Sequence, residues 1–142
     1  MTAELRPENE VPPIPGTSPE ASARGAVQVT LNITRDTAGA LTGATARFDL
    51  QVVGLPGDTV LVGAHIHPGV SGVNGPVVVN TGLASTTALT AIGSAQTVTL
   101  DGIAVAPAVA QAIIDNPAGH YFNVHSFRHP GGVLRGQLRR AF

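Results

Sequence analysis

The chain has 142 residues, a length suited to one domain with a single hydrophobic core. Its composition, 43% hydrophobic and 12% charged, is typical of a globular protein, and a net charge of -1 without any lysine argues against nucleic acid or an anionic membrane surface as partner. Cysteine is absent, which excludes disulfides and thiolate metal sites, and no apolar run approaches the roughly 20 residues that a membrane helix needs.

Residues 1–24 contain five prolines together with several Ser, Thr and Glu residues. Prolines at this density favour an extended or irregular backbone, and we expect that structure for this N-terminal segment. The first residues, Met1 to Glu4, lack the apolar stretch of a signal peptide. This predicts either an intracellular protein or a mature form that begins at Met1.

After residue 24, apolar and polar residues alternate along most of the chain, as they do in half-buried strands. Turn residues such as those at 36–39 separate the alternating segments at intervals typical of antiparallel sandwiches and barrels. The pattern predicts strands at 27–34, 47–52, 60–67, 76–80, 94–100, about 120–127 and about 132–140.

One segment departs from this pattern and has helical spacing instead. Val109, Ala112 and Ile113 would share one face of a helix that starts near Pro107 and stops at Asn116-Pro117. We therefore predict a single all-β domain over residues 1–142. Its fold is expected to be a Greek-key antiparallel β-sandwich or barrel of about eight strands, with one short helix near 107–115.

Three of the five histidines lie in two short segments of the predicted strands, 64–69 and 123–126. Side chains two residues apart point to the same side of a strand, so His65 and His67 share one face. The residues expected to face the core on these two strands alternate with the histidines: Val60, Val62, Ala64, Ile66, Phe122 and Val124. His65, His67 and His125 are therefore expected on the outer face, where three imidazoles converge if the strands are neighbours.

A convergence of three imidazoles favours a metal site. Imidazole is the commonest protein ligand for borderline transition metals. Three neutral imidazoles without a thiolate suit Cu(II), which heads the affinity order of the divalent metals, and zinc is the alternative. The competing interpretation is that these histidines are polar residues on a solvated strand face.

The neighbouring segments predict what surrounds the histidines. A hairpin centred near Pro130 is expected to place Arg135 across from His125, unless the register slips by two residues. Residues 68–75 follow the histidine pair and contain three glycines. This segment is expected either to fold over the outer face as a lid or to be an ordinary turn.

The remaining two histidines are expected outside the cluster. His120 has the opposite parity to His125 and is predicted to be structural or exposed. His129 falls in the predicted hairpin loop, where solvated surface is expected and a role as a mobile extra ligand is the alternative.

Several motifs carry a family resemblance. In this order and over nearly the whole chain, they resemble the CHRD domain, which is named for its repeats in chordin and also occurs as a single module in many bacterial proteins. The resemblance implies an all-β CHRD domain that is commonly exported, hence a secreted or periplasmic location. The motifs are Asn9-Glu10-Val11-Pro12-Pro13, 64–69 (AHIHPG) with 74–78 (NGPVV), 121–126 (YFNVHS) and 131–138 (GGVLRGQL).

A second resemblance concerns chemistry. A His-x-His strand, a later Val-His, a Gly-rich turn and an arginine are similar to the copper half of Cu,Zn superoxide dismutases. It implies that His65, His67 and His125 are copper ligands on the outside of a Greek-key barrel and that Arg135 guides anions. The bridging histidine and the zinc ligands of those enzymes have no counterpart between residues 68 and 119, and their disulfide is absent.

These observations lead to three functional hypotheses. The first is a mononuclear copper site at which Arg135 attracts small anions, with oxidoreductase activity on a small oxygen species. The second, suggested by the chordin repeats, is a non-catalytic binding module in which the histidines hold the 68–75 loop and the function lies in contact with a protein partner. The third is a metal-free enzyme in which a histidine acts as general base beside Arg135.

Overall fold

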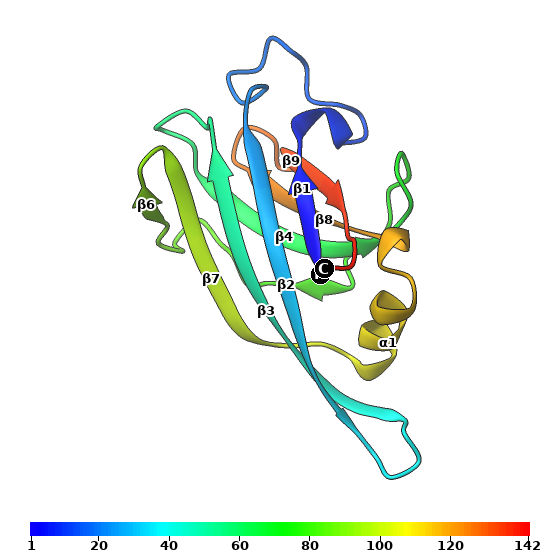
Figure 1. The fold of residues 1–142 in the computed structure, drawn as a ribbon. Helices are drawn as coiled ribbons and strands as arrows, with labels where there is room; N and C mark the ends of the chain where they lie inside the picture. Colours follow the sequence, from blue (N-terminus) through cyan, green and yellow to red (C-terminus); the bar gives the residue numbers. More distant parts are fainter.

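The computed structural model describes residues 1–142 and contains two antiparallel sheets packed as a sandwich (Figure 1). The first sheet has the strand order β1 (Thr2–Leu5), β2 (Arg24–Arg35), β3 (Leu41–Val53), β7 (Ala95–Ala104) and β6 (Thr90–Ile92). The second has the order β5 (Val79–Asn80), β4 (Leu61–Pro68), β8 (His120–Ser126) and β9 (Leu134–Gln137). The helices are α1 (Pro107–Asp115) and the short 3-10 turns η1 (Pro7–Asn9) and η2 (Pro117–Gly119).

The core lies between the sheets. It is built from the side chains that point inward, which alternate along each strand with side chains that point outward. Phe48 of β3 and Phe122 of β8 are fully buried, and their ring centroids are 5.7 Å apart. Ala64 and Ile66 of β4 and Val124 of β8 are equally buried. This burial confirms the inward face that alternation predicts for the middle of β4 and for β8.

The connections explain how the two histidine-bearing strands become neighbours. The chain crosses from β3 to β4 in the second sheet, returns so that β7 pairs with β3, and crosses again so that β8 pairs with β4. Returns of this kind characterise Greek-key sandwiches. Backbone bridges between Thr2 and Arg139 and between Arg6 and Arg135 join the edge strands β1 and β9 and close one side of the sandwich.

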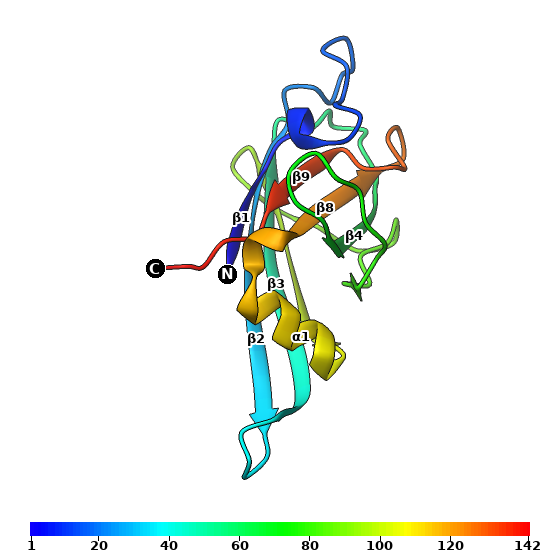
Figure 2. The ribbon, with the colours of Figure 1, turned by 90° about the vertical axis from the view of Figure 1, so that its right-hand side faces the viewer.

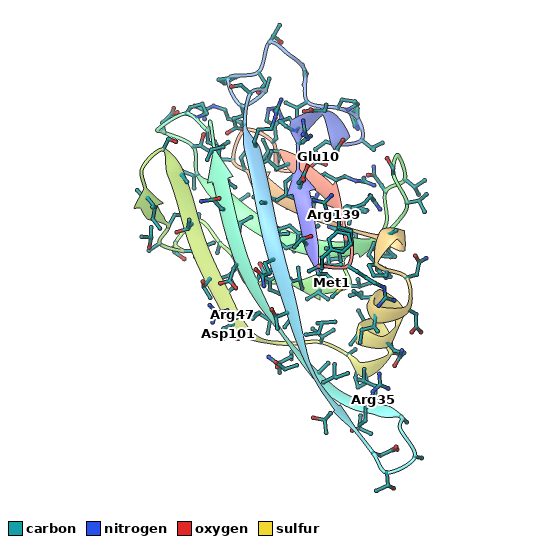
Figure 3. All side chains as sticks on the ribbon, in the orientation of Figure 1. Met1, Glu10, Arg35, Arg47, Asp101 and Arg139 are labelled. Carbon is teal, nitrogen blue, oxygen red and sulfur yellow. The ribbon has the colours of Figure 1, made fainter.

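The outer face of the first sheet is solvated and polar. Arg47 forms ion pairs with Asp49 at 3.0 Å and with Asp101 at 3.4 Å, and all three side chains are at least one third exposed. Figure 3 labels Arg47 and Asp101 on this face. No helix of the structure is long and apolar enough to span a membrane. The outer face of the second sheet differs, because the loop after β4 lies over it.

The all-β sandwich with one short helix is confirmed, and the helix has the predicted bounds. The N-terminal segment was expected to be extended or irregular, but residues 2–5 form strand β1 because they pair with β2. Strand β6 was not predicted, and β5 is limited to two residues of the predicted 76–80. Whether such short segments form strands depends on pairing with a neighbouring strand, and two or three alternating residues are too few to reveal that pairing.

The first residues of the strand predicted at 60–67 face the side opposite to the predicted one. Val60 was expected in the core but is 43% exposed, whereas Leu61 is buried. An irregularity in the pairing of β4 with β8, between Leu61 and Gly63, accounts for this. An extra residue in one strand inverts the parity beyond it, so the alternation is valid only from Ala64 onward.

Candidate metal centre

Strands β4 and β8 bring the three predicted histidines together on the outer face of the second sheet. In their antiparallel register, His65 pairs with Asn123, and His125 pairs with Gly63. Since Gly63 has no side chain, the rings of His65 and His125 approach over it, with centroids 4.7 Å apart. The predicted convergence of His65, His67 and His125 is therefore found.

The ligand atoms of the three imidazoles are close enough to share one ion. One nitrogen from each ring lies within 4.8 Å of the others. His65 Nδ1 and His125 Nε2 are 2.9 Å apart. The interpretation of these residues as a solvated strand face does not fit, because His67 is buried and the other two are half-buried.

Backbone carbonyls fix the orientation of two of the rings. His67 Nδ1 donates to the carbonyl oxygen of Gly75 at 2.9 Å, and His125 Nδ1 donates to that of Pro130 at 2.8 Å. In a neutral imidazole, donation from Nδ1 leaves a lone pair on Nε2. Both Nε2 atoms therefore have a lone pair available to a metal ion, and each ring has the outer hydrogen bond that metal-binding histidines usually have.

Burial favours the neutral form of His65 and of His125. It lowers the pKa of His65 to about 4, with further lowering by the nearby His125 and His67. Burial also lowers the pKa of His125, against an opposing effect of the hydrogen bond to Pro130. Because only the unprotonated nitrogen binds a metal, these two rings are ready to do so at neutral pH.

The loop of residues 68–75 is a lid over this face rather than an ordinary turn (Figure 2, green). Hydrogen bonds hold both ends of the loop. Gly69 N donates to the carbonyl oxygen of Gly119, and Gly75 N donates to the Tyr121 hydroxyl. A Cβ atom at residue 75 would collide with the carbonyl oxygen of Pro68, so only glycine fits there. The close packing of the lid thereby places the carbonyl oxygen of Gly75 within hydrogen-bond distance of His67 Nδ1.

Arg135 lies under the lid. It pairs with Asn123 in the register of β8 and β9, so the expected position across from His125 is wrong by two residues. Its guanidinium donates to the lid carbonyls of Val70 and Val73 and to Asn74 Oδ1, and the residue is only 1% exposed. The outward face was predicted correctly, but the side chain is enclosed there by the lid.

Two residues that sequence reasoning did not assign to the site adjoin the histidines. Asn123 Oδ1 is 3.0 Å from His67 Nε2 and 3.1 Å from His125 Nε2. Glu10, which is labelled in Figure 3, is buried; it lies against Gly132 and close to Asn123 and Arg135. Burial raises the pKa of Glu10 to about 7, although Arg135 and a hydrogen bond from Asn123 oppose the rise.

Sequence signals for these two residues existed. Asn123 shares the outward parity of His125, and Glu10 stands in the Asn9–Pro13 motif. Neither signal indicates a contact with the histidines, because the N-terminal segment meets β8 only in the folded chain.

His120 and His129 lie outside the cluster. His120 is buried and donates from Nδ1 to the carbonyl oxygen of Asn116 at 3.0 Å, which is a structural role. His129 Nε2 is 2.8 Å from Ser18 Oγ and faces the N-terminal segment. Neither ring contributes to the group of three ligand nitrogens.

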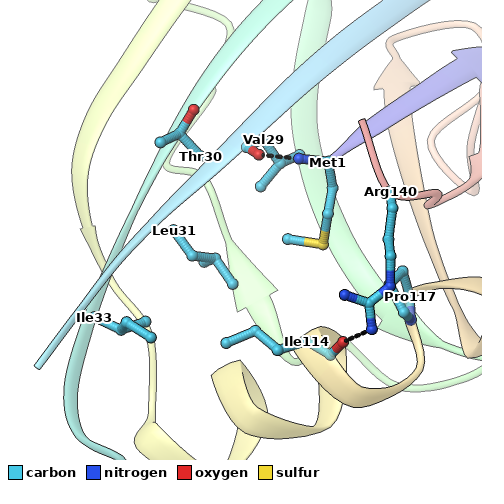
Figure 4. Close-up of a pocket in the computed structure, with 8 residues that line it drawn as sticks. All are labelled: Met1, Val29, Thr30, Leu31, Ile33, Ile114, Pro117 and Arg140. Carbon is cyan, nitrogen blue, oxygen red and sulfur yellow. Dashed lines mark hydrogen bonds between the residues drawn. The ribbon is translucent and has the colours of Figure 1, made fainter. Parts of the chain in front are cut away.

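A separate apolar pocket of about 290 Å³ lies between β2 and the region of α1 (Figure 4). Leu31, Ile33 and Ile114 line it, and Arg140 stands at its edge with a hydrogen bond to the carbonyl oxygen of Ile114. It contains no histidine and no carboxylate, so it shares no chemistry with the metal centre.

Comparison with known proteins agrees with the motifs. The family model described as the CHRD domain matches residues 1–138 of the 142-residue chain. No curated protein and no solved structure gives a significant match, and the resemblance to superoxide dismutases is not confirmed. The chain belongs to the CHRD domain family.

Proposed function

We propose that this CHRD-domain protein binds one copper ion through His65 Nδ1, His67 Nε2 and His125 Nε2. The observation that carries the proposal is that one nitrogen of each of these three rings lies within 4.8 Å of the other two. The Nδ1 hydrogens of His67 and His125 are engaged by backbone carbonyls, so two lone pairs are held toward one point. Such preorganisation is what a metal site requires.

Copper is preferred to zinc because of the ligand chemistry. The three ligands are neutral imidazoles, and Cu(II) has the highest affinity of the divalent first-row metals for such a set. Structural zinc sites favour four tetrahedral ligands and often include thiolates, which this chain lacks. Zinc is the competing metal, so the binding experiment described below includes both ions.

We further propose that the copper-loaded protein has oxidoreductase activity on a small oxygen species. Copper supplies one-electron redox chemistry when bound. The simplest reaction is dismutation, in which two superoxide anions and two protons give dioxygen and hydrogen peroxide. His65 and His125 are only half-buried, so solvent reaches part of the cluster. The enclosed Arg135 contributes as a fixed positive charge beneath the lid rather than as an exposed ligand for the anion.

The copper site is tested by titrating metal-free protein with Cu(II) and Zn(II) and recording electron paramagnetic resonance of the Cu(II) form. Wild-type protein is expected to bind one equivalent of copper with nitrogen hyperfine structure. The His65→Ala/His67→Ala variant is expected to lose this binding, whereas His129→Ala, outside the cluster, keeps it. Equal, weak binding by wild type and the double variant would falsify the site.

The redox activity needs its own measurement. Superoxide dismutation by the copper-loaded protein is compared with the same concentration of free copper and with an Arg135→Ala variant. A rate no higher than that of free copper removes the enzymatic activity and leaves a copper-binding protein. An unchanged rate in the variant removes only the contribution of the arginine charge.

One observation favours a second candidate function, a non-catalytic interaction module. Val70, Val73 and Val77, on and beside the lid, are 57%, 50% and 49% exposed. Apolar side chains grouped over one loop are a common feature of protein contact surfaces. If the protein is an interaction module, replacing the three valines by serine is expected to abolish partner binding, whereas the histidine variants are expected to keep it. We also propose a secreted or periplasmic location, which fits the family.

A further inference from the structure

The amide oxygen of Asn123 lies among the ligand nitrogens of the metal centre. Oδ1 is 3.0 Å from His67 Nε2 and 3.1 Å from His125 Nε2, while His65 Nδ1 is 2.9 Å from His125 Nε2. Asn123 is 3% exposed, so no bulk water competes for this oxygen. Four potential ligand atoms from β4 and β8 are thus collected in one place.

The amide oxygen of Asn123 is the end that faces the histidines. The buried carboxyl group of Glu10, whose Oε1 has no hydrogen-bond partner, lies close to Asn123. Gly132 permits this arrangement, because a Cβ atom at that position would overlap both oxygens of Glu10 at 2.6 and 2.7 Å.

This orientation leaves hydrogen-bond acceptors facing one another. His67 and His125 direct their Nδ1 hydrogens to carbonyl oxygens, so their Nε2 atoms are acceptors, and Asn123 Oδ1 is an acceptor as well. Asn123 Oδ1 thus lies 3.0 Å from one imidazole acceptor and 3.1 Å from the other, and acceptors this close with no hydrogen between them repel one another. A cation placed among them removes this repulsion.

We propose that Asn123 Oδ1 is the fourth ligand of the metal centre, giving a three-nitrogen, one-oxygen ligand set. The inference rests on the proposed function and specifies the ligands of that same site. It assigns to Asn123 a direct bond to the metal.

The chemistry of this ligand set favours copper over zinc. Sites of nitrogen and oxygen ligands are typical of Cu(II), whereas structural zinc sites often include thiolates.

The first test uses the wild-type protein, so that it does not depend on the folding of a variant. Protein labelled with ¹³C at the side-chain carbonyl of asparagine is loaded with one equivalent of Cu(II) and studied by electron–nuclear double resonance. Ligation through Oδ1 is expected to give a resolved ¹³C hyperfine coupling from Asn123. The absence of such a coupling overturns the assignment.

The second test compares variants of Asn123 by copper titration and electron paramagnetic resonance. Asn123→Asp keeps an oxygen ligand and is expected to retain binding, while Asn123→Leu removes it. The leucine variant is expected to bind Cu(II) about tenfold or more weakly, to change the copper hyperfine splitting, and to lose preference for copper over zinc. Asn32→Leu, at an exposed position of β2, is the matched control for the substitution.

The outcomes separate this inference from the proposed function. If wild-type protein binds no copper, the proposed function fails and the fourth ligand fails with it. If wild type binds copper but Asn123→Leu has the same affinity and the same spectrum, the three-histidine site stands and the role of Asn123 is refuted. A changed spectrum in Asn123→Leu that Asn123→Asp restores supports the oxygen ligand.

Discussion

The guanidinium carbon of Arg135 lies 3.5 Å from the centroid of the Tyr121 ring, on the outer face of the second sheet. The ring of His67 stacks on the same tyrosine, nearly parallel, with centroids 4.8 Å apart. Tyr121 therefore links the arginine that binds the lid to a histidine of the metal centre. Changes at Arg135 should reach the cluster through this stack and through the lid.

Arg135→Ala is expected to destabilise the protein by roughly 3 kcal/mol, because it leaves the carbonyl oxygens of Val70 and Val73 without their buried donor. Chemical denaturation measures the loss, and hydrogen exchange of residues 70–75 reports the loosened lid. Arg139→Ala removes an exposed arginine and is expected to change stability by less than about 0.5 kcal/mol. Equal effects of the two substitutions would contradict the structural role of Arg135.

Gly75→Ala is expected to destabilise the lid because its Cβ atom would collide with the carbonyl oxygen of Pro68. Overpacking of this kind typically costs about 1–3 kcal/mol. The displaced loop should also withdraw the Gly75 carbonyl from His67 and weaken copper binding. Gly57→Ala, where nothing lies within 4 Å, is the control. An unaltered unfolding curve and copper titration for Gly75→Ala would show that the loop adapts freely.

The metal-free protein should lose stability as the pH falls from about 6.5 to about 4, partly because of His65. Its pKa is about 4 in the folded protein, whereas an unfolded histidine titrates near 6.5. In this window the unfolded state binds the proton and the folded state does not, so acid favours unfolding. Denaturation of wild type and His65→Gln in the presence of a chelator checks this. A stability difference that is constant from pH 4 to pH 7 would contradict the shifted pKa.

Glu10 should act in the opposite direction. Its pKa is about 7 in the folded protein and near 4.5 when unperturbed, so the folded state binds the proton more tightly. The stabilising contribution is complete below pH 4.5 and is lost as the pH rises through 7. Glu10→Gln is therefore expected to gain stability relative to wild type, by roughly 2–3 kcal/mol between pH 4.5 and pH 8. Parallel curves of unfolding free energy against pH for the two proteins would refute this.

The faces of the strands follow from the sequence alone because side chains alternate with a period of two. That period places Ala64 and Ile66 inward and His65 and His67 outward whatever the partner strand is. The helix is determined in the same local way, with Pro107 at its start and Asn116-Pro117 at its end. These features require no knowledge of distant contacts.

Register and enclosure were decided only by the tertiary structure. Alternation cannot distinguish positions two residues apart, and so it did not reveal that Arg135 pairs with Asn123 rather than His125. The lid, which buries Arg135, and the N-terminal segment, which brings Glu10 to Asn123, are joined to β8 and β9 by contacts between residues far apart in the chain. The outward-facing histidines could thus be predicted from the sequence. The enclosure of the histidines and their contact with Asn123 depend on how the chain folds and how loops of irregular sequence pack over the sheet, and no local periodicity encodes that packing.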